Sequence, residues 1–264
     1  MFPFVRFFRR RPPAEPLSDA QKQILSQEVP FYDRLAEDSR ARLDERIPVF
    51  LAQTRFEGCG GLALTEPMRL LIAAEACRLR LGHEDPVYPD LRGVLVYPDD
   101  FLVPVSDPDE SGVVSEGVEW RSGESWQTGS VVLSWREIRF DVRDSRARQR
   151  GQSRPGLYPA RNLILHEFAH QLDYSYHLST GIDADTGEAL APSALNAVLS
   201  DAYRRLWRGP ENRRRPALDD YGAESPAELF AVAVESYFET PAELRRQYPE
   251  LHAQVGLLLG AIEG

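Results

Sequence analysis

The spacing of apolar and polar residues divides the chain into a helical first part, a strand-rich middle and a helical last part. Helical periodicity runs over residues 18–54, with interruptions expected at Pro30 and Pro48. A second, largely apolar helix is expected over residues 66–81. The glycines at positions 58, 60 and 61 predict a turn between these two helical stretches.

The pattern changes to that of strands after residue 92. Short runs rich in β-branched and aromatic residues at 93–97, 101–105 and 130–135 predict strands. Residues 113–126, which precede the third run, have an ambiguous pattern that predicts no definite element. Residues 136–156 carry many arginines and are expected to be mostly loop. A small mixed sheet is therefore predicted in the middle of the chain.

Helical patterns return after the sheet. Residues 159–176 predict a helix that is apolar nearly all round, with Pro159 in its first turn. A turn-rich surface loop is expected over 175–193. The predicted fold is mixed α+β. Its expected parts are a flexible tail at 1–16 and a single domain at 17–264, divided into a helical part (17–82), a sheet (93–136), the apolar helix (159–176) and a C-terminal helical part (194–264).

The apolar helix contains the motif H-E-x-x-H, formed by His166, Glu167 and His170. Residues four apart lie on one face of a helix, so both imidazoles can reach the same metal ion. Neutral imidazole suits zinc, and a neighbouring carboxylate can take a proton from a water bound to that metal. A polar trio in an apolar helix is costly unless something satisfies it. The motif therefore predicts one zinc ion per chain, with Glu167 as general base.

The composition limits the classes of partner and the cellular compartment that are expected. The formal net charge is -10, with acidic and basic residues spread along the chain, so nucleic acid is not expected as a partner. Two cysteines give no disulfide framework, which favours a reducing compartment, so a cytoplasmic protein is expected. The tail at 1–11 mixes aromatic residues and arginines but is too short and too interrupted to cross a membrane. No stable membrane insertion is expected.

A catalytic zinc site needs a third protein ligand, and the residues alone leave several candidates open. Glu228 and Glu235 lie two turns apart on one face of an apolar helix, and Glu224 precedes them. Buried carboxylates need a partner, which a metal would supply. Ser225-Pro-Ala-Glu228 is also a capping box, in which Glu228 would bond only to the Ser225 amide. His177, just after the H-E-x-x-H helix, is a further candidate.

The chain resembles the Mlc titration factor A family of zinc peptidases, gluzincin-like enzymes whose catalytic core is similar to that of anthrax lethal factor. The resemblance rests on five motifs that span most of the chain. They are Phe56-Glu-Gly-Cys-Gly-Gly-Leu62, Ile72-Ala-Ala-Glu-Ala-Cys77, Val131-Val-Leu-Ser-Trp135, His166-Glu-Phe-Ala-His-Gln-Leu-Asp173 and Tyr221-Gly-Ala-Glu-Ser-Pro-Ala-Glu228. Two segments depart from the family pattern: the stretch between Trp135 and Asn162, and Tyr174-Ser-Tyr176.

The resemblance implies a zincin-like fold, in which an edge strand lies over the active-site helix, and a role for each site residue. Glu228 becomes the third zinc ligand beside His166 and His170, and Tyr221 would donate its hydroxyl to the developing oxyanion. Glu235 or Asp173 would orient a ligand histidine. The edge strand that pairs with an extended substrate is expected at Val131, Val132, Leu133, Ser134 and Trp135.

The implied activity is zinc-dependent hydrolysis of peptide bonds, aminopeptidase-like on short peptides. The family's name also implies binding to a glucose-responsive transcriptional repressor of sugar uptake. The alternative is a non-catalytic, zinc-stabilised binding protein that sequesters such a repressor. A structural zinc site of that kind would have four protein ligands and no open position, so His177 or Glu235 would have to coordinate the metal.

Overall fold

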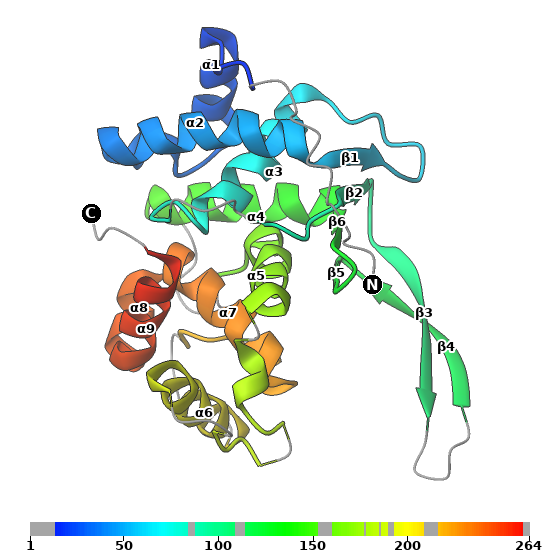
Figure 1. Ribbon diagram of the computed structural model, residues 1–264, viewed down its shortest axis with the longest axis vertical. Helices are drawn as coiled ribbons and strands as arrows, with labels where there is room; N and C mark the ends of the chain where they lie inside the picture. Colours follow the sequence, from blue (N-terminus) through cyan, green and yellow to red (C-terminus); the bar gives the residue numbers. More distant parts are fainter. Residues whose placement is uncertain are drawn as a thin grey trace, which may run out of the picture.

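A computed structural model confirms the mixed α+β class. It describes residues 14–83, 88–108, 114–152, 160–176, 178–184, 186–189, 193–208 and 216–260. The N-terminal helices, the sheet and the C-terminal helices surround α5 (Leu163–Tyr176), which lies at the centre of the molecule (Figure 1). One hydrophobic cluster joins residues from Leu17 to Leu259. No helix within the described ranges is long and apolar enough to cross a membrane.

The first part of the chain is helical, as predicted, with one difference at a proline. It comprises α1 (Asp19–Glu28), the 3-10 turn η1 (Tyr32–Arg34), α2 (Glu37–Gln53) and α3 (Glu66–Arg78). The interruption expected at Pro48 is wrong, because α2 continues through it. A proline inside a helix removes one hydrogen bond, and its ring crowds the carbonyl one turn earlier. The burial of Leu43, Ile47 and Phe50 around Pro48 offsets this cost.

The sheet has four strands in the order β1-β2-β6-β5. These are β1 (Arg55–Gly58), β2 (Gly93–Tyr97), β6 (Ser130–Ser134) and β5 (Gly123–Trp126). β6 pairs in parallel with β2 and antiparallel with β5. The predicted edge strand at Val131–Ser134 is therefore wrong: β6 is interior, because residues 123–126, left ambiguous by their pattern, cover its second side. Among the described residues, β5 forms the edge of the sheet on that side.

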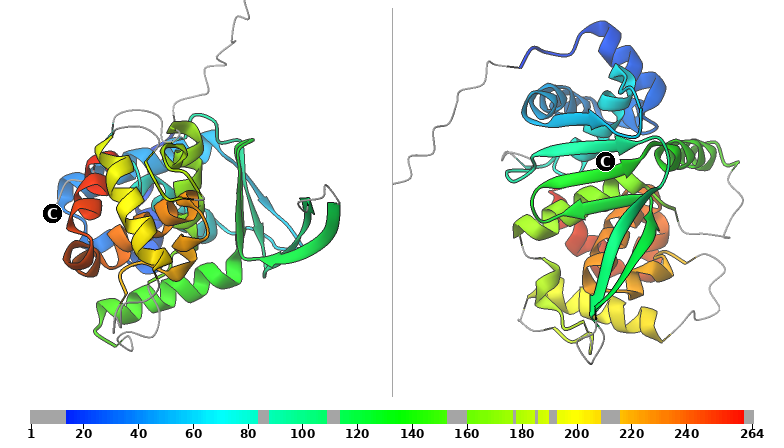
Figure 2. Two further views of the ribbon diagram at one scale, coloured as in Figure 1. Left: turned by 90° about the horizontal axis from the view of Figure 1, so that it is seen from below. Right: turned by 90° about the vertical axis from the view of Figure 1, so that its right-hand side faces the viewer.

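A separate hairpin leaves the sheet between β2 and β5. It is formed by β3 (Phe101–Pro108) and β4 (Val114–Arg121), which pair antiparallel. Figure 1 and the left-hand view of Figure 2 show the hairpin standing away from the helices. β1 was also missed, because the sequence predicted only a turn near Gly58.

The arginine-rich segment expected to be loop is mostly the helix α4 (Trp135–Gln149). Its first turn is capped by the Ser134 hydroxyl, which accepts from the Glu137 amide at 3.4 Å. Ile138 and Ser145 are buried on its inner side. The polar face that suggested a loop is the solvent face of an amphipathic helix. Trp135 consequently belongs to a helix and not to the predicted edge strand.

The last part of the chain is helical, as predicted, and packs around α7 (Pro226–Glu239). The helix α5 begins at Leu163, later than expected, and Pro159 lies outside the described residues. The remaining elements are η2 (Ser179–Gly181), α6 (Ala194–Trp207), η3 (Asp220–Ala223), α8 (Pro241–Gln247) and α9 (Pro249–Leu259).

Candidate metal centre

The start of α5 is fixed by side chains that satisfy its first amides. The Asn162 side-chain oxygen accepts from the Leu165 amide at 3.1 Å, and an Asp141 carboxylate oxygen from α4 accepts from the Leu163 amide at 2.8 Å. The first amides of a helix have no partner within the helix, so such caps stabilise its N-terminus. These contacts set the position of His166, one turn further along.

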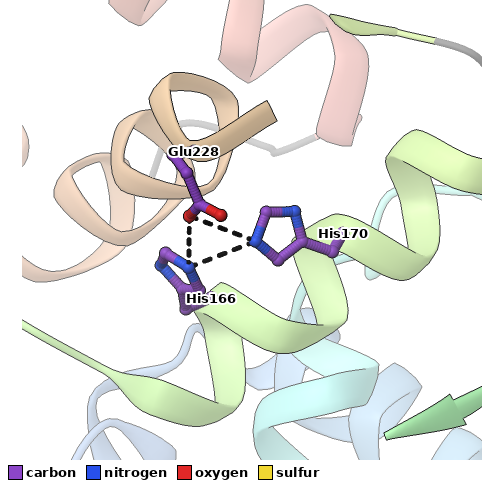
Figure 3. Close-up of side chains that lie close together, drawn as sticks. All are labelled: His166, His170 and Glu228. Carbon is purple, nitrogen blue, oxygen red and sulfur yellow. Dashed lines mark hydrogen bonds and ion pairs between the residues drawn. The ribbon is translucent and has the colours of Figure 1, made fainter. Parts of the chain in front are cut away.

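Three donor atoms converge between α5 and α7 (Figure 3). His166 Nε2 lies 2.9 Å from Glu228 Oε2 and 3.2 Å from His170 Nε2, and His170 Nε2 lies 3.3 Å from the same carboxylate oxygen. The capping interaction of Glu228 uses only its backbone: its amide donates to the Ser225 hydroxyl at 3.2 Å. The side chain is thereby left to face the histidines, so capping and ligation do not compete.

The donor set fits zinc. Ligands at roughly 2.0–2.1 Å from a tetrahedral zinc ion lie about 3.3 Å from one another, close to the spacing of these three atoms. Burial disfavours charge on Glu228, but hydrogen bonds with His166 and His170 outweigh it and lower its pKa to about 2. Glu228 is therefore a carboxylate at neutral pH, the form in which it can bind a metal.

Glu235, also on α7, holds the far side of the His166 ring. Its Oε1 lies 2.8 Å from His166 Nδ1, while its Oε2 accepts from the Asn162 amide at 2.6 Å. Asp173 does not share this position, because its carboxylate accepts from the amide and the hydroxyl of Ser179. Of the two residues expected to orient a ligand histidine, the structure places only Glu235 against one.

Glu167 points from α5 towards the edge strand. It is buried, and burial raises its pKa to about 7, against the opposing charges of His166 and His170. A Cβ atom added to Gly123 of β5 would lie 2.3 Å from Glu167 Oε1. The carboxylate is therefore packed directly against the backbone of the free edge of the sheet.

Tyr221 in η3 lies beside the cluster. Its ring centroid lies 5.9 Å from that of His166, and the side chain is 40% exposed. Burial of the remainder, together with the charge of Glu228, raises its pKa to about 12. Its hydroxyl is therefore a hydrogen-bond donor at neutral pH. Glu224 is exposed on the surface, and His177 lies outside the described residues.

Sequence reasoning missed the contribution of β5 to this site. The signal was present in Gly123, because a glycine inside a strand often marks a close approach of another group. Here that group is Glu167. The strand itself was ambiguous because it has only the four residues Gly123–Trp126 and carries no clear alternation of apolar side chains.

Comparison with known proteins identifies the family. The family described as glucose-regulated metallo-peptidase M90 matches residues 5–258. The chain belongs to this family. It is 35% identical over 238 residues to the protein slr2042 of Synechocystis sp., a match that covers 90% of this chain and 82% of the relative.

Members named Mlc titration factor A are similar over the same extent. The protein of Pectobacterium atrosepticum is 29% identical over 257 residues, covering 90% of this chain and 87% of the relative. That of Yersinia enterocolitica is 28% identical over 254 residues, covering 90% and 84%. The resemblance to the Mlc titration factor A family is thus confirmed. The M90 membership is that of a metallopeptidase family, which agrees with the convergence of His166, His170 and Glu228.

Proposed function

We propose that this protein is a zinc-dependent peptidase of zincin-like, gluzincin type. The observation that carries the proposal is the convergence of two imidazole nitrogens and one carboxylate oxygen on a single point, with Glu167 beside them against the edge of a sheet. In this proposal His166, His170 and Glu228 hold one zinc ion per chain. Zinc held there would polarise a water molecule and lower its pKa to roughly 7.

The side chains around that position perform the proton transfers. Glu167 takes a proton from the attacking water and passes it to the leaving amine, a role that a carboxylate with a pKa of about 7 suits at neutral pH. Tyr221 donates its hydroxyl to the carbonyl oxygen as negative charge develops there. Glu235 keeps the His166 ring in place, because it is bonded to both Nδ1 and the start of α5.

The substrate strand of this proposal is β5 in place of β6. Its free edge can pair with an extended peptide, as exposed sheet edges commonly do. Gly123 brings the peptide backbone next to Glu167, because no side chain separates them. The substrates are peptides, and the proposed activity is aminopeptidase-like on short ones. Cys59 and Cys77 are both free, which fits the proposed cytoplasmic location.

Glu167→Gln tests the proposal directly. The variant should bind zinc in the same amount as the wild type and lose peptide turnover by about 10²–10⁴-fold. The matched control is Glu250→Gln on an exposed turn of α9, which should keep both properties. Full activity of Glu167→Gln would contradict its role as general base. Absence of zinc from the wild type, even after zinc is added back, would contradict the enzyme itself.

A second role is binding to a glucose-responsive transcriptional repressor, supported by the name Mlc titration factor A of the relatives. Binding alone, without catalysis, is the competing function. It predicts that Glu167→Gln changes nothing, and it requires a fourth protein ligand to close the zinc site. Three residues converge in the described part of the chain, which favours a site with an open position.

A further inference from the structure

The free edge of the sheet is fastened to α5 at one end. The Tyr174 hydroxyl donates to the Ser125 carbonyl at 3.0 Å. The Gln171 side-chain amide donates to the Ser125 hydroxyl at 2.6 Å and to the Trp126 carbonyl at 3.0 Å. Both side chains come from the helix that carries His166 and His170. The second half of β5 is therefore occupied by the protein's own side chains.

The hydrogen-bond pattern of β5 shows which of its backbone groups face outward. The Ser134 amide donates to the Ser122 carbonyl at 2.7 Å, and pairs of this kind alternate along an antiparallel ladder. Ser122 and Glu124 consequently face β6, whereas the N–H and C=O groups of Gly123 and Ser125 point to the free edge. A peptide added to this edge can pair only with Gly123 and Ser125 before β5 ends.

These two positions are not equivalent. Gly123 lies directly against the Glu167 carboxylate, so a peptide bond paired there is next to the proposed general base. The Ser125 carbonyl already accepts from Tyr174. If the peptide runs antiparallel to β5, the residues that reach Ser125 are those on the amino side of the bond held at Gly123. Tyr174 therefore stands in the path of the amino-terminal part of a long peptide.

Tyr174 is held firmly in that place. Its ring stacks against His170 with centroids 6.3 Å apart and 21° between the planes. Moving the ring away would break both the stacking and the bond to Ser125.

We propose that Tyr174 is a specificity-determining residue that closes the edge of β5 and restricts the enzyme to peptides with few residues on the amino side of the scissile bond. This inference rests on the proposed peptidase function and deepens it. It gives the aminopeptidase-like preference a physical cause, because a longer amino-terminal extension would have to displace the Tyr174 ring and its hydrogen bond.

The test compares two fluorogenic peptides that are identical after the scissile bond. One begins with a single free amino acid before that bond, and the other carries three further residues and an acetyl cap. We expect wild type to prefer the short peptide. Tyr174→Ala should raise the ratio of kcat/KM for the extended over the short peptide at least about tenfold, equivalent to about 1.4 kcal/mol. Tyr174→Phe should raise it less, because the ring remains.

Tyr176→Phe is the matched control, since Tyr176 is 44% exposed and receives its hydrogen bond from Arg80 at 3.3 Å, away from β5. This variant should keep the wild-type ratio, and all variants should contain the same amount of zinc. An unchanged ratio in zinc-loaded Tyr174→Ala would overturn the inference. A rise in kcat/KM of Tyr174→Ala that is confined to peptides extended on the carboxyl side would also overturn it.

Binding of both peptides to the Glu167→Gln variant, measured by calorimetry, separates this inference from the proposed function. The short peptide should bind it more tightly than the extended one, and adding Tyr174→Ala should remove the difference. If both peptides bind and are cleaved equally well with and without the Tyr174 side chain, the inference about Tyr174 is overturned and the peptidase function stands. A wild type that cleaves neither peptide, with no binding to Glu167→Gln, would overturn the peptidase function and this inference with it.

Discussion

Glu235 joins His166 to the start of the helix that carries it. One carboxylate oxygen lies 2.8 Å from His166 Nδ1, and the other accepts from the Asn162 amide at 2.6 Å. Because Asn162 also caps α5 through its side chain, a single carboxylate from α7 fixes both the ring and the backbone that positions it. The orientation of His166 is therefore set by tertiary contacts as well as by its place in the helix.

Glu235→Gln should weaken zinc binding about 10–100-fold, the usual cost of losing a partner that orients a metal ligand. An amide has one oxygen, so it cannot accept from both the histidine and the Asn162 amide, and one of these groups would lose its bond. Competition with a chelator measures the affinity. Glu45→Gln on the exposed face of α2 is the control. Equal affinities in Glu235→Gln and wild type would show that the contact does not support the ligand.

The chain contains its own control for the third ligand. Ser225-Pro-Ala-Glu228 and Thr240-Pro-Ala-Glu243 have the same pattern, but only Glu228 faces the histidines. Glu228→Ala should lose most of the zinc, whereas Glu243→Ala should keep it, because losing one of three protein ligands weakens a site far more than losing a helix-end carboxylate. Metal analysis of both variants decides the assignment. Undiminished zinc in Glu228→Ala would move the third ligand elsewhere.

Gly123→Ala should lower kcat/KM on the order of a hundredfold while zinc content stays the same. The added Cβ would lie 2.3 Å from Glu167 Oε1 and 2.7 Å from Leu163 Cδ1, so the carboxylate must move. A displacement of about 1 Å at a reacting group can cost this much. Steady-state kinetics and a thermal-unfolding curve separate a displaced base from a destabilised fold. Wild-type kinetics would show that Glu167 does not need its present position.

Deprotonation of Glu75 should lower the free energy of unfolding as the pH rises. It is 2% exposed on α3, and burial raises its pKa to about 7, against the opposing charge of Arg78. The folded protein therefore holds this proton more tightly than the unfolded chain. The resulting stability is fully present below about pH 4.5 and is lost as the pH rises through about 7.

Glu75→Gln, which has no proton to lose, should lose less stability than the wild type between about pH 5 and pH 8. The free energy of unfolding in urea, measured at several pH values, tests this. The exposed Glu57→Gln should follow the wild-type curve. Parallel curves for Glu75→Gln and the wild type would mean that this carboxyl is not protonated in the folded protein.

The sequence by itself determined the local part of the site. The spacing of His166 and His170 places both rings on one helical face, because the helix repeats every 3.6 residues. The apolar residues around them predicted that this helix is buried, and most of α5 is buried. The mixed α+β class, the helices at both ends and the family also followed from the sequence, since each depends on short-range patterns or on motifs.

Tertiary structure decided which segments meet. The residues alone left both Glu228 and Glu235 open as the third ligand, and the family resemblance favoured Glu228. The packing of α7 on α5 places Glu228 at His166 Nε2 and Glu235 at Nδ1. Long-range pairing decides which strand lies at the edge of the sheet. The edge is therefore the four-residue strand β5, whose pattern is weak, and not the apolar run at 131–134. Apolar side chains favour burial, so the apolar strand β6 lies in the interior of the sheet. Gly123 of β5 then lies at the edge, beside Glu167.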